Sequence, residues 1–126
     1  MRRSGPFGAA AAEGAQQGVE ITIVFASHAN NVPRSLLSEP LRADLGADDT
    51  SIVLGPPTGY VVKFTNGLVA YLSSDTSVFG DMKMVVSDYH KANLAVINLG
   101  PNPGLFQSGA YAINDLLKPA SVILTH

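Results

Sequence analysis

Residues 60–73 read YVVKFTNGLVAYLS, and this stretch decides the fold. It holds two runs rich in β-branched and aromatic residues, 60–64 and 68–73, which are typical of strands. The dipeptide Asn66-Gly67 between them supplies the positive φ angles that a tight β-hairpin turn requires. A rigid turn is predicted directly before the hairpin, where residues 55–59 read GPPTG. The stretch therefore predicts two antiparallel strands in the middle of the chain.

Three further apolar runs flank the hairpin and predict strands, at residues 19–26 (VEITIVFA), 94–99 (LAVINL) and 121–125 (SVILT). Residues 30–49 separate the first of these strands from the hairpin and are interrupted by Pro33 and Pro40. We expect this segment to be irregular, with a short helix within residues 35–45.

Two helices are predicted, at residues 77–91 and 108–117, because apolar residues recur there at spacings of three and four. The side chains expected to face the core are Phe79, Met82, Val86 and Tyr89 in the first helix and Ala110, Ile113, Leu116 and Leu117 in the second. Residues 100–104 (GPNPG) predict a loop before the second helix, and Pro119 ends that helix. A hairpin followed by strand–helix–strand units predicts a mixed α/β sheet.

The composition bounds the class of protein. The chain has 126 residues, of which 46% are hydrophobic and 14% are charged, and its formal net charge is −2. Such a balance can build a buried core, and the length suits one domain. The weak negative charge argues against a nucleic-acid partner, and no apolar run approaches the ~20 residues of a membrane-spanning helix. We expect a cytoplasmic protein with neither a nucleic-acid nor a membrane partner.

The first 18 residues differ from the rest of the chain in composition and in hydrophobic periodicity. Residues 1–18 are rich in alanine and glycine and show no periodicity, so we expect a flexible tail there. Residues 19–126 carry all the predicted strands and helices, so we assign the folded domain to them.

Three polar residues follow predicted strands: His28, Asp75 and His126. In α/β sheets, ligands gather outside the carboxyl ends of the strands. If these strands run in the same direction, the three side chains can meet there. The chain has no cysteine, so imidazole and carboxylate groups are the donors it can offer to a zinc, manganese or iron ion. The positions therefore make His28, Asp75 and His126 candidate metal ligands.

Simpler interpretations of these residues stay open. A histidine after a strand is most often a solvated loop residue, and an aspartate before a helix is most often an N-cap. The remaining histidine, His90, is expected near the end of a helix beside Lys91, where it would be solvated and favourable to the helix dipole. We therefore exclude His90 from the candidate site.

Several short motifs in this chain resemble those of one family. They are residues 55–62 (GPPTGYVV), 66–68 (NGL), 71–76 (YLSSDT), 79–83 (FGDMK), 94–96 (LAV) and 116–119 (LLKP). From residue 19 to residue 126 the chain resembles the C-terminal half of a metallo-β-lactamase-fold hydrolase, and it is most similar to metal-dependent hydrolases related to ascorbate-phosphate lactonase. The resemblance implies half of an αββα sandwich, which is a mixed β-sheet with helices packed on one face.

The resemblance also implies a two-metal centre of zinc or manganese. The family's histidine after a strand, the aspartate of its turn and its late histidine match His28, Asp75 and His126. Asp75 would bridge the two ions and is the expected catalytic residue, with His28 on one ion and His126 on the other. The implied chemistry is hydrolysis of an ester, lactone or phosphodiester by a water molecule that the metals activate.

The family's other metal motif, His-x-His-x-Asp-His, has no counterpart here, because residues 1–27 contain no histidine. A catalytic zinc usually has three protein ligands, so we expect this chain to be incomplete or inactive alone. The halved sheet would also leave one face for another element to cover. The expected partners are a small-molecule substrate and either a second copy of the chain or a complementing N-terminal half. The alternatives are a non-catalytic domain that acts through self-association or a partner, and a truncated product without a function.

Overall fold

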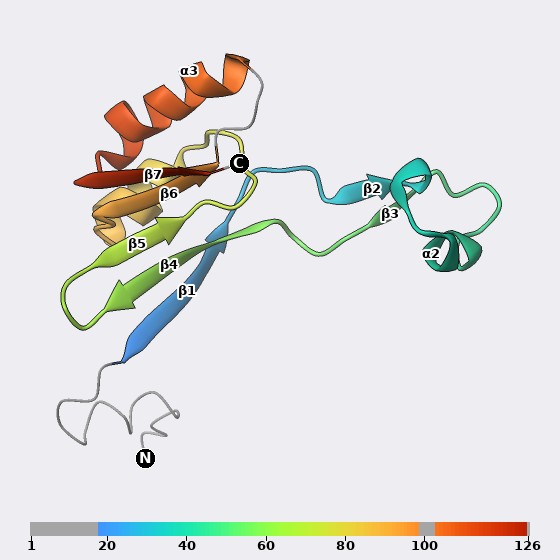
Figure 1. Ribbon diagram of the computed structural model, residues 1–126, viewed down its shortest axis with the longest axis horizontal. Coiled ribbons are helices and arrows are strands. Elements are labelled where there is room, and N and C mark those ends of the chain that lie inside the picture. Colours follow the sequence, from blue (N-terminus) through green and yellow to red (C-terminus); the bar gives the residue numbers. More distant parts are fainter. Residues whose placement is uncertain (1–17, 99–102, 126) are drawn as a thin grey trace.

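The computed structural model describes residues 18–98 and 103–125. Five strands form one sheet in the order β1-β4-β5-β6-β7 (Figure 1). Their bounds are Val19–Phe25 for β1, Thr58–Phe64 for β4, Val69–Leu72 for β5, Leu94–Asn98 for β6 and Ser121–Thr125 for β7. The helical segments after the hairpin are η2 at Met82–Tyr89, α3 at Pro103–Tyr111 and η3 at Ala112–Leu117. The predicted mixed α/β sheet is confirmed, whereas the expected tail lies, apart from Gly18, outside the described residues.

The strand directions follow from the pairing. Strand β4 is antiparallel to both β1 and β5, whereas β6 is parallel to β5 and β7 is parallel to β6. Strands β1, β5, β6 and β7 therefore run in one direction. The hairpin β4–β5 lies where the sequence places it, and Gly67 in its turn has a φ of 88°. Strand β4 begins at Thr58, inside the expected rigid turn, because Thr58 already pairs with Phe25 of β1.

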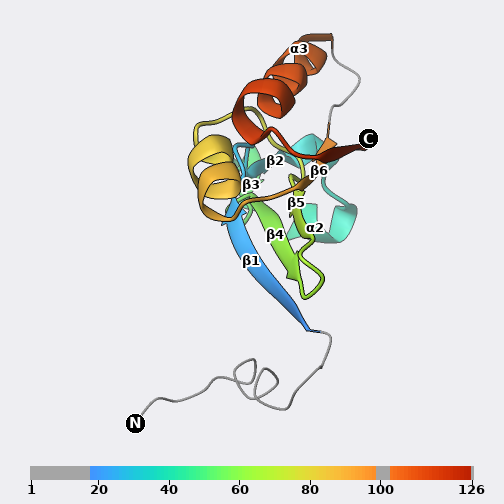
Figure 2. The same cartoon turned by 90° about the vertical axis from the view of Figure 1, so that its left-hand side faces the viewer.

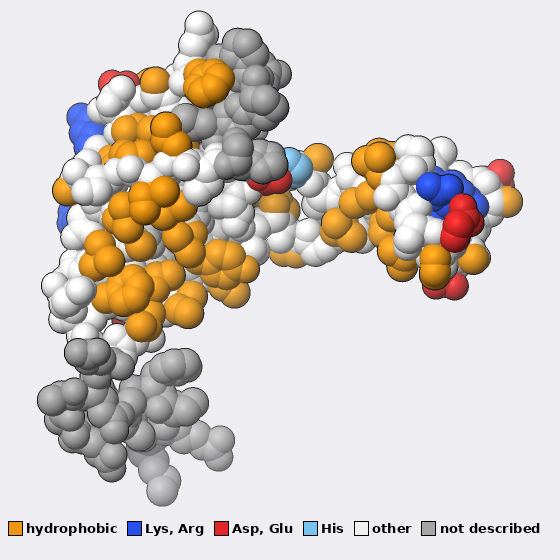
Figure 3. Space-filling view, viewed as in Figure 1, with side chains coloured by type: hydrophobic (Ala, Val, Ile, Leu, Met, Phe, Trp, Pro, Cys, Tyr) orange, Lys and Arg blue, Asp and Glu red, His pale blue; other side chains and the backbone are white. Residues whose placement is uncertain are grey.

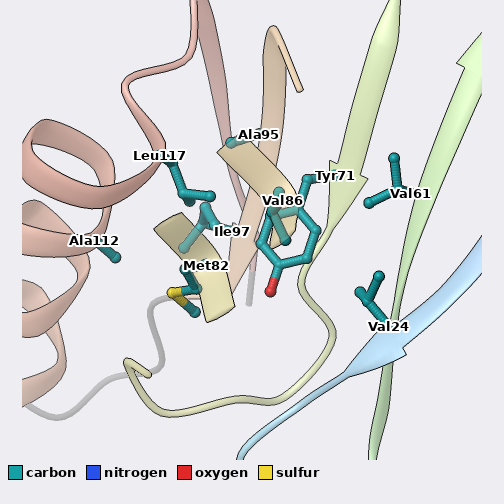
Figure 4. Packing of buried hydrophobic residues seen from close by; sticks show 9 residues of the cluster. All are labelled: Val24, Val61, Tyr71, Met82, Val86, Ala95, Ile97, Ala112 and Leu117. Carbon is teal, nitrogen blue, oxygen red and sulfur yellow. The ribbon is translucent and has the colours of Figure 1, made fainter. Parts of the chain in front are cut away.

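One face of the sheet is covered by helices, which close the core (Figure 2). Figure 4 shows the buried cluster, made of Val24, Val61, Tyr71, Met82, Val86, Ala95, Ile97, Ala112 and Leu117. The helical segments η2 and η3 are also joined directly, because the Ser87 hydroxyl in η2 donates a 3.0 Å hydrogen bond to the carbonyl oxygen of Leu117 in η3. Helices on one face of a mixed sheet are what half of an αββα sandwich requires.

The opposite face of the sheet carries no helix in the described parts of the chain, and we call it the open face. The register aligns its side chains in rows across the sheet, as in Ile23–Tyr60–Leu72–Val96–Ile123. Ile21 and Ile23 on this face are 64% and 66% exposed. Figure 3 shows the hydrophobic side chains gathered over the strands.

An arm projects from the sheet between β1 and β4 (Figure 1). It contains β2 at Asn31–Pro33, η1 at Arg34–Leu36, α2 at Glu39–Ala43 and β3 at Ser51–Val53, and β2 pairs with β3. The Arg34 guanidinium ties the arm together by donating hydrogen bonds to the carbonyl oxygens of Gly46 (2.7 Å) and Asp49 (3.3 Å). The short helix was expected here, but the two-stranded ladder was not.

The first predicted helix is shorter than expected and wound differently. It begins at Met82 rather than at residue 77, and it is π-helical, with a 2.9 Å bond from the His90 amide to the Val85 carbonyl oxygen. The wider turns of such a segment bring every fourth residue to the core, so Met82, Val86 and His90 are buried. The prediction that Tyr89 faces the core and that His90 is solvated was wrong, since Tyr89 is 75% and His90 is 7% exposed.

The second predicted helix begins earlier than expected. Helix α3 starts at Pro103, inside the expected loop, because proline is well suited to the first position of a helix. The remaining positions of that loop up to residue 102 lie outside the described residues. The chain becomes π-helical from Ala112 to Leu117, which turns Ala112 into the core and leaves Ala110 exposed, contrary to prediction. In the described ranges, no helix combines the length and apolar character that a membrane crossing requires.

Candidate metal centre

The carboxyl ends of β1, β5, β6 and β7 meet at one edge of the sheet, because these four strands run in the same direction. We call this edge the rim. Beyond the strands, the segments after β1 and β5 are joined by two bonds. The Ser77 amide donates to the Ser27 carbonyl oxygen (2.7 Å), and the Ser27 amide donates to the Thr76 hydroxyl oxygen (2.9 Å). The neighbours of Ser27 and Thr76 are His28 and Asp75, so the structure places these two candidates on bridged segments.

His28 follows β1 and is exposed. Its ring Nδ1 lies 2.8 Å from the carbonyl oxygen of Ala29. A carbonyl oxygen can only accept, so Nδ1 is the donor, and in the uncharged form of the ring this leaves the lone pair on Nε2. This hydrogen bond to a backbone carbonyl is the arrangement that orients a metal-ligating histidine and sets its tautomer.

Asp75 follows β5 and is also exposed. Its Oδ1 accepts a hydrogen bond from Nδ2 of Asn98, the last residue of β6. Asn98 is itself fixed in place, because its backbone amide donates a 3.1 Å hydrogen bond to the hydroxyl oxygen of Ser73. Ser73 is a buried residue, only 1% exposed. A carboxylate that is oriented through one oxygen can offer the other to a cation.

Asn98 is a rim residue that the sequence analysis missed. The signal was present, because an amide side chain closes the otherwise apolar run of β6. Its role became visible only when β6 was paired beside β5, which brings Asn98 next to Asp75.

His126 lies outside the described residues. The preceding residue, Thr125, pairs with Asn98 in the β6–β7 ladder, so β7 ends at the same rim. Within residues 18–98 and 103–125, no group of three or more His, Cys, Asp or Glu side chains is close enough to hold a metal ion.

His90 lies in the core instead of at the rim. Its Nδ1 has no hydrogen-bond partner among the described residues. Burial lowers the pKa of His90, the positive charge of Lys63 lowers it further, and Glu20 opposes them. Burial likewise raises the pKa of Tyr71, another core residue, to about 12. Both side chains are therefore neutral at pH 7.

The donors at the rim fit a zinc or manganese ion in chemical type, because an imidazole and a carboxylate are present and each is oriented by a hydrogen bond. They do not fit in number, because His28 and Asp75 are two ligands and a catalytic zinc usually has three from the protein. Within the described residues, the rim therefore offers too few donors to hold a catalytic zinc by itself.

No family model matches the chain. Similar proteins include a UPF0173 metal-dependent hydrolase from Cupriavidus taiwanensis, 33% identical over 110 residues, and one from Polaromonas sp. strain JS666, 32% identical over 113 residues. The matches cover 86% of this chain but 36% and 37% of those relatives. The chain thus spans little more than a third of the length of the curated relatives it matches.

Among solved structures, the chain is similar to Igni18, a novel metallo hydrolase from the hyperthermophilic archaeon Ignicoccus hospitalis. The TM-score is 0.58 at 21% sequence identity, over 86% of this chain and 37% of that one. This likeness concerns the fold. Together with the relatives in sequence, it confirms the predicted resemblance to the C-terminal part of metallo-β-lactamase-type, metal-dependent hydrolases.

Proposed function

We propose that this chain is the C-terminal part of a metal-dependent hydrolase and that His28, Asp75 and His126 are its metal ligands. The observation that carries the proposal is the rim itself. His28 and Asp75 are far apart in sequence, yet they lie on segments that two hydrogen bonds join, and each is oriented as a metal ligand needs to be. The relatives named metal-dependent hydrolases support the same activity.

Each residue has a distinct task in this proposal. Asp75 would be a ligand shared by two ions, and the hydrogen bond that its Oδ1 accepts from Asn98 would fix the orientation of the carboxylate. His28 presents Nε2, and its bond to the Ala29 carbonyl oxygen prevents the ring from turning. Bound zinc or manganese would lower the pKa of a water molecule to make it a nucleophile and would polarise the scissile bond of an ester, lactone or phosphodiester.

The proposal is tested by measuring the metal content of the chain after purification in zinc or manganese and exhaustive dialysis. We expect Asp75→Ala to lose at least ten-fold in metal affinity, because one carboxylate serves both ions. Asp48→Ala is the matched control, since Asp48 is an exposed carboxylate on the arm. Equal metal occupancy in the Asp75→Ala variant and in the wild type would refute the assigned roles.

A non-catalytic domain that self-associates is the second candidate, and the open face favours it. The side chains there are apolar and exposed, as an association surface requires. A stable dimer that binds neither zinc nor manganese would support this second function over the first.

A further inference from the structure

A cleft lies between the edge strand β1 and the helical segment η2, which is the golden helix beside β1 in Figure 2. Its volume is about 250 Å³. The residues that line it are Thr22, Ile23, Val24, Phe25, Phe79, Asp81, Val85, Val86 and His90. His28 and Asp75 are not among them, so the cleft and the rim are built from different side chains.

The lining of the cleft is mostly apolar. Apart from Thr22, Asp81 and His90, every lining residue is hydrophobic. Two of them are aromatic, and the rings of Phe25 and Phe79 meet edge to face with their centroids 5.5 Å apart. Phe25 is 55% exposed, so a ligand that covers it removes apolar surface from water. Since a cavity of ~150 Å³ already binds benzene, this cleft has room for a substituted aromatic ring.

His90 adds one buried polar atom to this apolar lining. The residue is only 7% exposed, and its Nδ1 has no hydrogen-bond partner among the described residues. A buried polar atom without a partner destabilises the folded chain, and most such atoms in proteins are paired. A ligand in the cleft can therefore gain a hydrogen bond that no described side chain makes.

A hydroxyl group suits this nitrogen better than a charged group does. The His90 ring is neutral at pH 7, because burial and the positive charge of Lys63 lower its pKa. Nδ1 of a neutral ring donates in one tautomer and accepts in the other, and a hydroxyl group can pair with either form. An ammonium group only donates and a carboxylate only accepts. Asp81 is the one charged residue of the lining, so the cleft offers no cation to an anionic ligand.

We infer that the cleft between β1 and η2 binds an uncharged phenol, with its ring against the apolar lining and its hydroxyl group hydrogen-bonded to Nδ1 of His90. The inference does not depend on the proposed function, because it uses neither a metal ion nor a residue of the rim. It gives the chain a second small-molecule site, on the opposite side of β1 from strand β4.

Calorimetric titration of the 126-residue chain with p-cresol and with toluene tests this site. The two probes share a methylated ring and differ in one hydroxyl group. We expect p-cresol to bind at least about five-fold more tightly, because its hydroxyl group gains the hydrogen bond to His90. A cleft without a partner for the hydroxyl group would prefer toluene, which loses less hydration on binding. No binding of p-cresol, or equal or tighter binding of toluene, would overturn the inference.

The variant His90→Phe tests the role of the imidazole, because it keeps a ring in place and removes the nitrogen atoms. We expect this variant to lose the preference for p-cresol over toluene. Met84→Phe is the matched control, since Met84 lies in the same segment, is 67% exposed and does not line the cleft. It should keep the preference of the wild type. An undiminished preference in His90→Phe would overturn the assigned hydrogen bond.

NMR of the imidazole nitrogens in the wild type gives a test that needs no variant to fold. We expect p-cresol to shift the Nδ1 resonance of His90 and toluene to leave it nearly unchanged. The exposed ring of His28 is the internal control, and its resonances should not respond to either probe. An unchanged His90 resonance at saturating p-cresol would overturn the inference.

Discussion

His90 shows how the setting of one side chain depends on the winding of its helix. At regular α-helical spacing, the apolar pattern of η2 places Tyr89 inside and His90 outside. The π-helical winding reverses them, and the His90 ring packs edge-on against Tyr89 with the ring centroids 4.8 Å apart. A histidine that the sequence assigns to solvent is therefore a neutral core residue.

The pH dependence of stability follows from this burial. The unfolded chain binds a proton on His90 near its ordinary pKa of 6.5, whereas the folded protein holds that pKa lower. The contribution of the uncharged His90 to the free energy of unfolding is therefore fully present above pH 6.5, and it is lost as the pH falls toward the pKa of His90 in the folded protein. We expect urea unfolding to show lower stability at about pH 5.5 than at about pH 7.5.

The control for this prediction is His90→Gln, which keeps a polar side chain but does not titrate. Its stability should change less over the same pH interval than that of the wild type. An identical pH dependence in the two proteins would show that His90 is not the titrating group.

At the scale of elements, the hairpin depends on one glycine. Gly67 has a φ of 88°, which a residue with a Cβ adopts only with strain. We expect Gly67→Ala to lower the free energy of unfolding by about 1–2 kcal/mol in urea denaturation.

Gly55→Ala is the matched control for the hairpin. At both glycines an added Cβ would meet nothing within 4 Å, but only Gly67 has a positive φ. Gly55→Ala should therefore be neutral or slightly stabilising, since it only reduces the freedom of the unfolded chain. Equal losses at both sites would mean that backbone strain is not the cause.

The arm shows what local sequence patterns cannot reveal. Strands β2 and β3 have three residues each, too few for an alternating pattern to be visible. They pair because Arg34, beside β2, binds carbonyl oxygens of the segment that leads to β3. An ordered element thus replaces the expected irregular stretch.

At the scale of the whole molecule, stability comes from one apolar layer between the sheet and its helices. Met82 lies in that layer and is 2% exposed. We expect Met82→Ala to lower the free energy of unfolding by about 2–5 kcal/mol, because it leaves a cavity in the core. Met84→Ala, two residues along the same helix, should cost at most about 0.5 kcal/mol because that side chain is exposed. Similar losses for both variants in urea unfolding would contradict this location of the core.

The sequence by itself determined the hairpin, the strands after it and the resemblance to metal-dependent hydrolases. The reason is that turn chemistry at Asn66-Gly67 and β-branched runs act over a few neighbouring residues. The sequence also placed His28 and Asp75 after strands, but it did not determine whether their segments lie side by side.

The tertiary structure alone decided that four strands run the same way, that Asn98 orients Asp75, and that an uncharged face stays open. The π-helical winding that accompanies the burial of His90 is likewise visible only in the tertiary structure. These properties depend on strand register and on contacts between residues far apart in the chain, which no local pattern records.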